Sequence, residues 1–407
     1  MQFKDIIGQH NVKEQLVSMV QHNRLSHALL FLGKEGSGSL SLALAFTQYI
    51  VCTSTKEITA TGLFSTAISP PLTGEAGRGL DSCGSCAACK KAYQLIHPDI
   101  HFSFPVITKK TGEVAKSGNF INEWREFVAG NPYGNVYDWL QFIEAENKQG
   151  NITAKECEEI SHIINLKSFE SQYKIMIMWM PEFLGKEGNK LLKLIEEPPP
   201  HTLFIFVAED ENDILPTILS RTQLVKITSL SDSEIEQALI AEKGVDETKA
   251  RQISSVCEGN YREALQILKH ADEDWQGMLR EWLNAILKGG PSAQVKWIDE
   301  IGKLGREKQK QFIRYFIHLL QQAIRVRLYS DHNNRNTEMT NNISEKDHDF
   351  AARLNNICSL EAQDAMVNEL DKATYYIERN AHGKMLFHAL SIRLYHIIKD
   401  NSLILIN

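Results

Sequence analysis

The sequence lacks the features that would place a protein in a membrane or make it a general nucleic-acid binder. No stretch of its 407 residues approaches 18 uninterrupted apolar residues, the length that a membrane-spanning helix requires. The first residues, Met1–Asp5, show no signal-peptide pattern, so we expect a cytoplasmic protein without a membrane-embedded part. The formal net charge is −7, so any contact with nucleic acid must come from a local basic patch.

A disulfide framework is not expected, because seven cysteines are an odd count in a chain of this length. Cys83, Cys86 and Cys89 form a Cys-x-x-Cys-x-x-Cys pattern, and Cys52 lies upstream at the end of an apolar helical run. Four thiolates bind zinc tetrahedrally, and such a closed set leaves no open position for catalysis. The pattern therefore predicts a structural zinc site, with an iron–sulfur cluster or metal-free thiols as the alternatives. We interpret the other three cysteines as ordinary helix residues.

A glycine-rich turn in the first fifty residues has the pattern of a phosphate-binding P-loop. The apolar run Ala28–Leu32 is typical of a buried strand, and Gly33, Gly36 and Gly38 follow it directly before a helical stretch. Strand, glycine turn and helix together form the scaffold on which backbone amides bind phosphate. A plain turn without a ligand is the alternative at this point.

The side chains that nucleotide chemistry needs are missing from this scaffold. Ser39 stands where the pattern requires the lysine that contacts the β- and γ-phosphates, and Leu40 stands where a hydroxyl group would bind Mg²⁺. A later strand, which begins at Lys174, ends in Met178-Trp179-Met180, where an active ATPase has an aspartate and a glutamate. Because two separate halves of the site are lost together, we expect no tight binding of Mg-ATP and no hydrolysis. Bare backbone amides attract an anion only weakly.

Two long segments interrupt the pattern of helices and strands. Residues 53–82 are rich in Thr, Ser, Gly and Pro. We interpret them as an inserted loop that brings Cys52 close to the other three cysteines. Residues 102–150 are rich in aromatic side chains and contain the pair Lys109-Lys110. Aromatic and basic residues together are also found where single-stranded nucleic acid stacks. We interpret the segment instead as an insertion that covers itself with a small core of its own.

Five motifs give the first two thirds of the chain a family resemblance. They are Phe3-Lys-Asp-Ile-Ile-Gly-Gln9, His27-Ala-Leu-Leu-Phe-Leu-Gly33, the four cysteines, Leu191-Leu-Lys-Leu-Ile-Glu-Glu-Pro-Pro199 and Pro216-Thr-Ile-Leu-Ser-Arg221. Over about residues 1–270 the chain resembles the bacterial clamp-loader ATPases of the AAA+ class. The last third is supported only by its helical pattern and its position.

The resemblance implies an α/β AAA+ P-loop module with a small helical lid, followed by an all-α C-terminal collar domain. The implied boundaries are 1–226 for the P-loop module, with both insertions, 227–272 for the lid and 273–407 for the collar. Such subunits assemble into a five-membered arc in which each ATP site lies at a subunit boundary.

Two arginines match arginines that have roles in the family. Arg221 matches the finger that completes the ATP site of a neighbouring subunit, where a planar cation suits the charge that develops on the γ-phosphate. The alternative is that Arg221 caps the preceding helix or pairs with an acid. Arg262 matches the arginine that reaches the phosphates in active relatives, and with an empty site we expect it to be structural and to pair within the interface between the domains.

Three functional hypotheses follow. In the first, which we favour, the chain is a non-catalytic clamp-loader subunit of the DNA polymerase III holoenzyme. It would act with the delta and gamma/tau subunits, the sliding clamp and primer–template DNA. In the second, the chain is an ATP-hydrolysing motor subunit of gamma/tau type with an altered P-loop, although Lys34 is the only lysine in the loop and lies at the wrong end. In the third, it is a zinc-stabilised DNA-binding adaptor, for which Lys90 and Lys91 beside the cysteines supply too little charge.

Overall fold

The structure is a computed structural model that describes most of the chain. The described residues are 1–54, 80–109, 114–145, 148–269, 274–331, 353–356, 358–378 and 381–400. Most of the predicted insertion 53–82 and Lys110 of the basic pair lie outside them. The chain divides into two compact units, Met1–Ala250 with Cys257–Leu265 and Arg251–Val256 with Gln266–Asn407.

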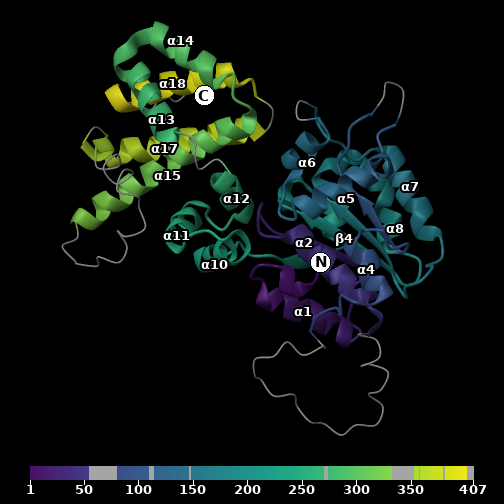
Figure 1. The fold of residues 1–407 in the computed structure, drawn as a ribbon. Helices are drawn as coiled ribbons and strands as arrows, with labels where there is room; N and C mark the ends of the chain where they lie inside the picture. Colours follow the sequence, from purple (N-terminus) through teal and green to yellow (C-terminus); the bar gives the residue numbers. More distant parts are fainter. Residues whose placement is uncertain are drawn as a thin grey trace. The chain divides into compact units, whose positions relative to one another are not determined.

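A five-stranded parallel sheet forms the centre of the first unit (Figure 1). Its strands are β1 (Ala28–Leu32), β2 (Ile100–Ser103), β3 (Lys174–Trp179), β4 (Thr202–Ala208) and β5 (Gln223–Lys226). Their order is β2-β3-β4-β1-β5, and every neighbouring pair is parallel. All residues of β3 and β4 are buried, which explains why their sequences are continuous apolar runs after the first residues, Lys174 and Thr202, and do not alternate. The predicted α/β class is therefore confirmed.

Helices cover both faces of this sheet. In chain order they are η1 (Phe3–Asp5), α1 (His10–Gln21), α2 (Ser39–Val51), α4 (Ala87–Tyr93), η2 (Ser117–Phe120), α5 (Ile121–Gly130), α6 (Val136–Phe142), α7 (Ala154–Asn165), η3 (Pro181–Leu191), α8 (Leu192–Glu196), η4 (Glu211–Asp213), α9 (Pro216–Leu219) and α10 (Asp232–Lys243). Two further helices, α11 (Glu247–Val256) and α12 (Tyr261–Lys269), contribute residues to both units.

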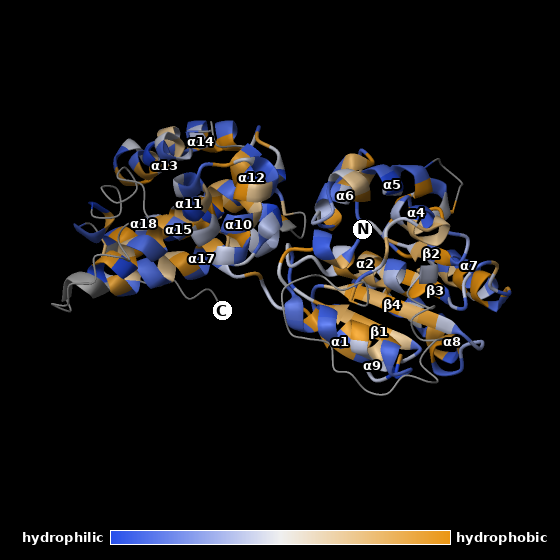
Figure 2. Ribbon diagram, turned by 60° about the horizontal axis from the view of Figure 1, so that its bottom comes forward, coloured by the Kyte–Doolittle hydropathy of each residue, from blue (hydrophilic) through white to orange (hydrophobic). Residues whose placement is uncertain are grey.

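The two faces of the sheet have separate hydrophobic cores because side chains alternate along a strand. Leu29 and Phe31 of β1 face a core that α1, α2, α4, α5 and α6 complete. Ala28 and Leu30 face the other core, which α7, α8 and α9 cover. Figure 2 shows the apolar strands β1 and β4 with α2 on one side and α9 on the other.

Most aromatic side chains of segment 102–150 are buried, as the core interpretation predicted, whereas Phe142 is exposed. Trp124 stacks on Phe104 with ring centroids 4.2 Å apart, and Trp139 packs edge-on against both rings. All three side chains are fully buried, so they do not offer a stacking surface for nucleic acid. The core is not the segment's own, however, because Trp124 also packs on Trp179 of β3 at 5.1 Å. The insertion is therefore part of the main core of the first unit.

The second unit is helical. Its elements are α13 (Trp275–Asn284), the π-helical turn η5 (Ala285–Gly289), α14 (Gly290–Ile301), α15 (Arg306–Asp331), α17 (Leu360–Glu378) and α18 (Gly383–Asp400). Its core centres on Trp282, which stacks on Trp297 and donates its indole N–H to Ser391 Oγ at 2.9 Å. None of the described helices combines the length and the hydropathy that a membrane crossing needs. The division at residues 226 and 272 stays a prediction.

Candidate functional site

The glycine-rich turn lies between β1 and α2, where the sequence predicted it. Gly36 and Gly38 adopt left-handed φ angles of +73° and +87°, which favour glycine. Ser39 and Leu40 begin α2 and are buried, and the Ser39 hydroxyl is hydrogen-bonded to that of Ser37 at 3.0 Å. The position of the missing lysine thus carries a short hydroxyl group that is bonded inside the loop.

The space in front of the loop is filled by the protein itself. The cavity there has a volume of about 20 Å³, which suffices for one water molecule and not for a triphosphate. Its lining includes Pro132-Tyr133-Gly134, from the connection between α5 and α6, and Trp179-Met180 at the end of β3. A Cβ atom on Gly38 would come within 2.8 Å of the Tyr133 ring, so the loop and the ring are in tight contact.

Hydrogen bonds fasten this connecting segment to the first turn of α2 and to the N-terminal segment. Ser41 donates its hydroxyl to the Pro132 carbonyl at 2.5 Å, and the Ile7 N–H donates to Tyr133 Oη at 3.0 Å. The Tyr133 ring also packs edge-on against Tyr261, with centroids 5.0 Å apart. Burial raises the pKa of Tyr133 well above its usual value, so the phenol stays neutral and keeps its O–H.

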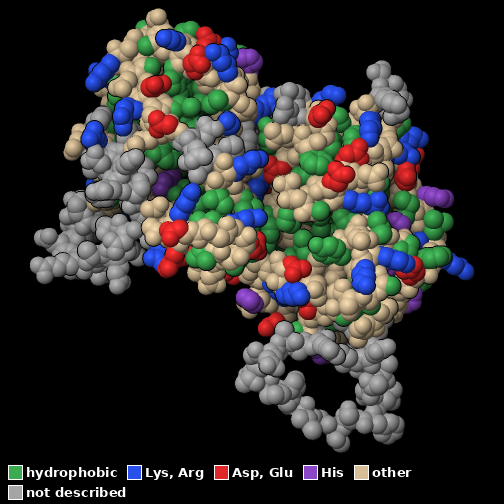
Figure 3. Space-filling model, in the orientation of Figure 1, with side chains coloured by type: hydrophobic (Ala, Val, Ile, Leu, Met, Phe, Trp, Pro, Cys, Tyr) green, Lys and Arg blue, Asp and Glu red, His purple; other side chains and the backbone are tan. Residues whose placement is uncertain are grey.

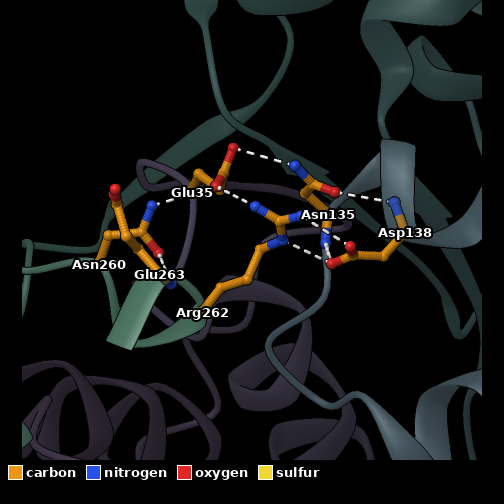
Figure 4. A network of polar contacts seen from close by, with 6 residues as sticks. All are labelled: Glu35, Asn135, Asp138, Asn260, Arg262 and Glu263. Carbon is orange, nitrogen blue, oxygen red and sulfur yellow. Dashed lines mark hydrogen bonds and ion pairs between the residues drawn. The ribbon is translucent and has the colours of Figure 1, made fainter. Parts of the chain in front are cut away.

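Arg262 is 3% exposed and is bound by two carboxylates (Figure 4). Its Nε–H and one Nη2–H donate to the two oxygens of Asp138 at 2.5 and 2.6 Å, and an Nη1–H donates to Glu35 at 3.0 Å. Glu35 also accepts from the side-chain amides of Asn135 and Asn260. The expectation that Arg262 pairs within the protein is confirmed.

Sequence reasoning missed both Tyr133 and Asp138. The only local signal is the capping box in which Asn135 and Asp138 begin α6, and it marks a helix start, not a contact with the loop.

The end of β3 offers no acid to a metal-bound nucleotide. Met178, Trp179 and Met180 are buried, and Glu182 lies beyond them. The carboxylate of Glu182 accepts the N–H groups of Glu209 and Asp210 at 2.7 and 3.2 Å. Burial raises the pKa of Glu182 despite these bonds.

The four cysteines predicted as metal ligands come together. The sulfur atoms of Cys52, Cys83, Cys86 and Cys89 all lie within 4.8 Å of one another. Backbone N–H groups point at three of them: Cys83 N–H at Cys52, Cys86 N–H at Cys83 and Cys89 N–H at Cys86, each at 3.4 Å. Such N–H donors stabilise thiolates, so the group is suited to hold one metal ion.

Arg221 lies two residues after the end of α9, and its side chain is about a third exposed. Its Nε–H donates to Glu196 at 2.6 Å, and its Nη1 donates to the Thr217 carbonyl at 2.8 Å. These contacts match the alternative interpretation, the pairing with an acid and the capping of the helix. The role of Arg221 at a neighbouring subunit stays a prediction.

Comparison with known proteins gives the chain a family. The family model described as "DNA polymerase III, delta subunit" matches residues 8–231, more than half of the chain. The DNA polymerase III subunit delta' of Bacillus subtilis is 27% identical over 262 residues, which cover 64% of this chain and 60% of that protein. The match thus spans less than two thirds of the Bacillus protein.

Two further similarities extend over more of the chain. The DNA polymerase III subunit gamma of Buchnera aphidicola is 23% identical over 343 residues, which cover 78% of this chain and 77% of that protein. A crystal structure of a gamma subunit-related protein from Thermotoga maritima aligns with 94% of this chain and all of that one, at 11% identity and a TM-score of 0.33.

The buried pairing of Arg262 yields a prediction about stability. Replacing it by methionine leaves Asp138 and Glu35 without their buried cation, so we expect the free energy of unfolding to fall by about 3–5 kcal/mol. Arg24→Met, at an exposed arginine, should change it by less than about 0.5 kcal/mol. Urea titrations followed by circular dichroism compare the two variants. Equal stability of both would contradict the structural role of Arg262.

Proposed function

The chain belongs to the DNA polymerase III delta subunit family of clamp-loader proteins, and within it we propose a non-catalytic subunit of the delta' type. It acts as a stator and supplies Arg221 in trans to the ATP site of a neighbouring motor subunit. The process it serves is the loading of the sliding clamp on primed DNA. Its proposed partners are the delta and gamma/tau subunits, the clamp and the primer–template DNA within the complex.

The filled nucleotide site carries this proposal. Ser39 and Leu40 remove the lysine and the Mg²⁺ ligand, and Tyr133 occupies the space in front of the loop. A motor subunit of gamma/tau type needs both the side chains and the space. Relatives named gamma match the chain as well, but its own nucleotide site favours the stator over the motor.

The two family arginines support a division of roles. Arg262 is buried and neutralised by two carboxylates of its own chain, so it is committed to holding the fold. Arg221 lies near the surface with a single exposed carboxylate beside it. A guanidinium group at the surface can bind a phosphate bidentately and stabilise the negative charge that grows as the γ-phosphate leaves.

The distribution of charge argues against an autonomous DNA-binding adaptor. The formal net charge is −7, and on the face shown in Figure 3 basic and acidic side chains are intermixed, with no continuous basic patch on that face among the described residues. Binding to DNA through phosphate contacts needs several clustered cations. We propose that contact with DNA occurs within the assembled complex.

We propose that the four cysteines bind structural zinc. All four donors are sulfur, and they come from the end of α2 and from the residues before and within α4. A closed tetrahedral sulfur set suits Zn²⁺ and leaves no position for a substrate. The metal would tie these two segments together.

Arg221→Ala in the reconstituted complex tests the finger. Arginine fingers contribute factors of about 10³–10⁵ in related phosphoryl transfers, so we expect at least a tenfold loss of DNA-stimulated hydrolysis at the neighbouring site. Arg221→Lys should not restore it, because lysine lacks the planar fork. Subunit assembly, measured by gel filtration, should be unchanged. Unchanged hydrolysis in an intact complex would refute the assignment.

Metal analysis tests the cysteine site. The purified chain should contain about one zinc ion, and Cys86→Ala should lower both the zinc content and the thermal stability. Cys257→Ala, at a buried cysteine outside the group, should keep the zinc. A folded chain without metal, or with iron instead of zinc, would count against this part of the proposal.

A further inference from the structure

The guanidinium of Arg221 is almost fully engaged within its own chain. Nε–H and one Nη2–H donate to the same carboxylate oxygen of Glu196, and Nη1 donates to the Thr217 carbonyl and to Ser220 Oγ. An arginine has five N–H donors. Only one of them, on Nη2, has no partner among the described residues.

Glu196 occupies the edge of Arg221 that a phosphate would use. The fork of Nε and Nη2 is the edge at which arginine binds carboxylate or phosphate oxygens in pairs. Glu196 is the last residue of α8, and Arg221 follows α9, which packs against α8. The carboxylate therefore competes for the same donors as a phosphate from a neighbouring subunit.

This ion pair is weak enough to be exchanged. The side chains of Arg221 and Glu196 are 31% and 46% exposed. Ion pairs this accessible to water contribute about 0–1 kcal/mol, because solvent screens them. A nucleotide phosphate, with more negative charge than one carboxylate, is the stronger partner for the fork. If Glu196 kept its bond while Arg221 bound the phosphate, its negative charge would oppose the phosphate charge.

We propose that Glu196 is a positioning residue for Arg221. In the free chain it holds the fork against α8, and it must release the fork before Arg221 can bind the phosphate of the neighbour's nucleotide. This inference rests on the proposed role of Arg221 as a finger. It adds a step to that role, in which the Nε and Nη2 donors of Arg221 exchange the carboxylate of Glu196 for a phosphate of the neighbour's nucleotide.

Glu196→Gln in the reconstituted complex tests the transfer. Glutamine keeps the size of the side chain and removes its charge, so we expect DNA-stimulated ATP hydrolysis to rise about two- to fivefold, the upper value corresponding to about 1 kcal/mol. Glu196→Asp retains the charge and should remain near the unmodified rate. Glu197→Gln, the adjacent exposed acid, is the matched control and should have no effect.

A double variant separates this inference from the proposed function. In the Arg221→Ala background, Glu196→Gln should change nothing, because the carboxylate acts only through that arginine. An unchanged or lower rate for Glu196→Gln alone, while Arg221→Ala is impaired, would overturn the inference and leave the finger in place. An equal effect of Glu196→Gln in both backgrounds would also overturn it. Full activity of Arg221→Ala would instead refute the proposed function itself.

Discussion

The buried ion cluster of Arg262 with Glu35 and Asp138 is the constraint on which the candidate site depends. A guanidinium group removed from water is tolerated only when anions satisfy it, and breaking such a cluster costs several kcal/mol. Its three members come from the glycine loop, the inserted segment and the start of α12. The cluster therefore fixes those three segments against one another, and the ring of Tyr133 is held in front of the loop between them.

The residues around the glycine-rich loop now stabilise the fold at the place where active relatives bind a nucleotide. The arginine that would otherwise reach a phosphate binds two carboxylates of its own chain, and the tyrosine fills the volume that a nucleotide would need. Under the proposed function, the subunit would exchange no nucleotide at this loop and would keep its shape while its neighbours hydrolyse ATP. That property suits a stator beside subunits that do move.

Sequence alone predicted the parts of the fold that depend on local patterns. Local patterns predicted the strand Ala28–Leu32, the glycine-rich turn and the cysteine group, because each signal lies in neighbouring residues. The loss of the lysine and of the Mg²⁺ ligand is also visible in the sequence, since Ser39 and Leu40 stand at their positions. The contacts of Tyr133 with Ile7 and of Asp138 with Arg262 could not be predicted, since they join residues 126 and 124 positions apart through an insertion without a motif. For Arg221 the sequence left pairing with an acid open but could not name Glu196.

The decisive experiment is calorimetric titration of Mg-ATP into the purified chain, with a gamma/tau motor subunit as the positive control. We expect no detectable binding under conditions in which the motor subunit binds, because the loop lacks its lysine and its pocket is filled. Tight, Mg²⁺-dependent binding would refute the non-catalytic assignment. It would mean that other groups replace the missing side chains and that the nucleotide displaces the segment around Tyr133.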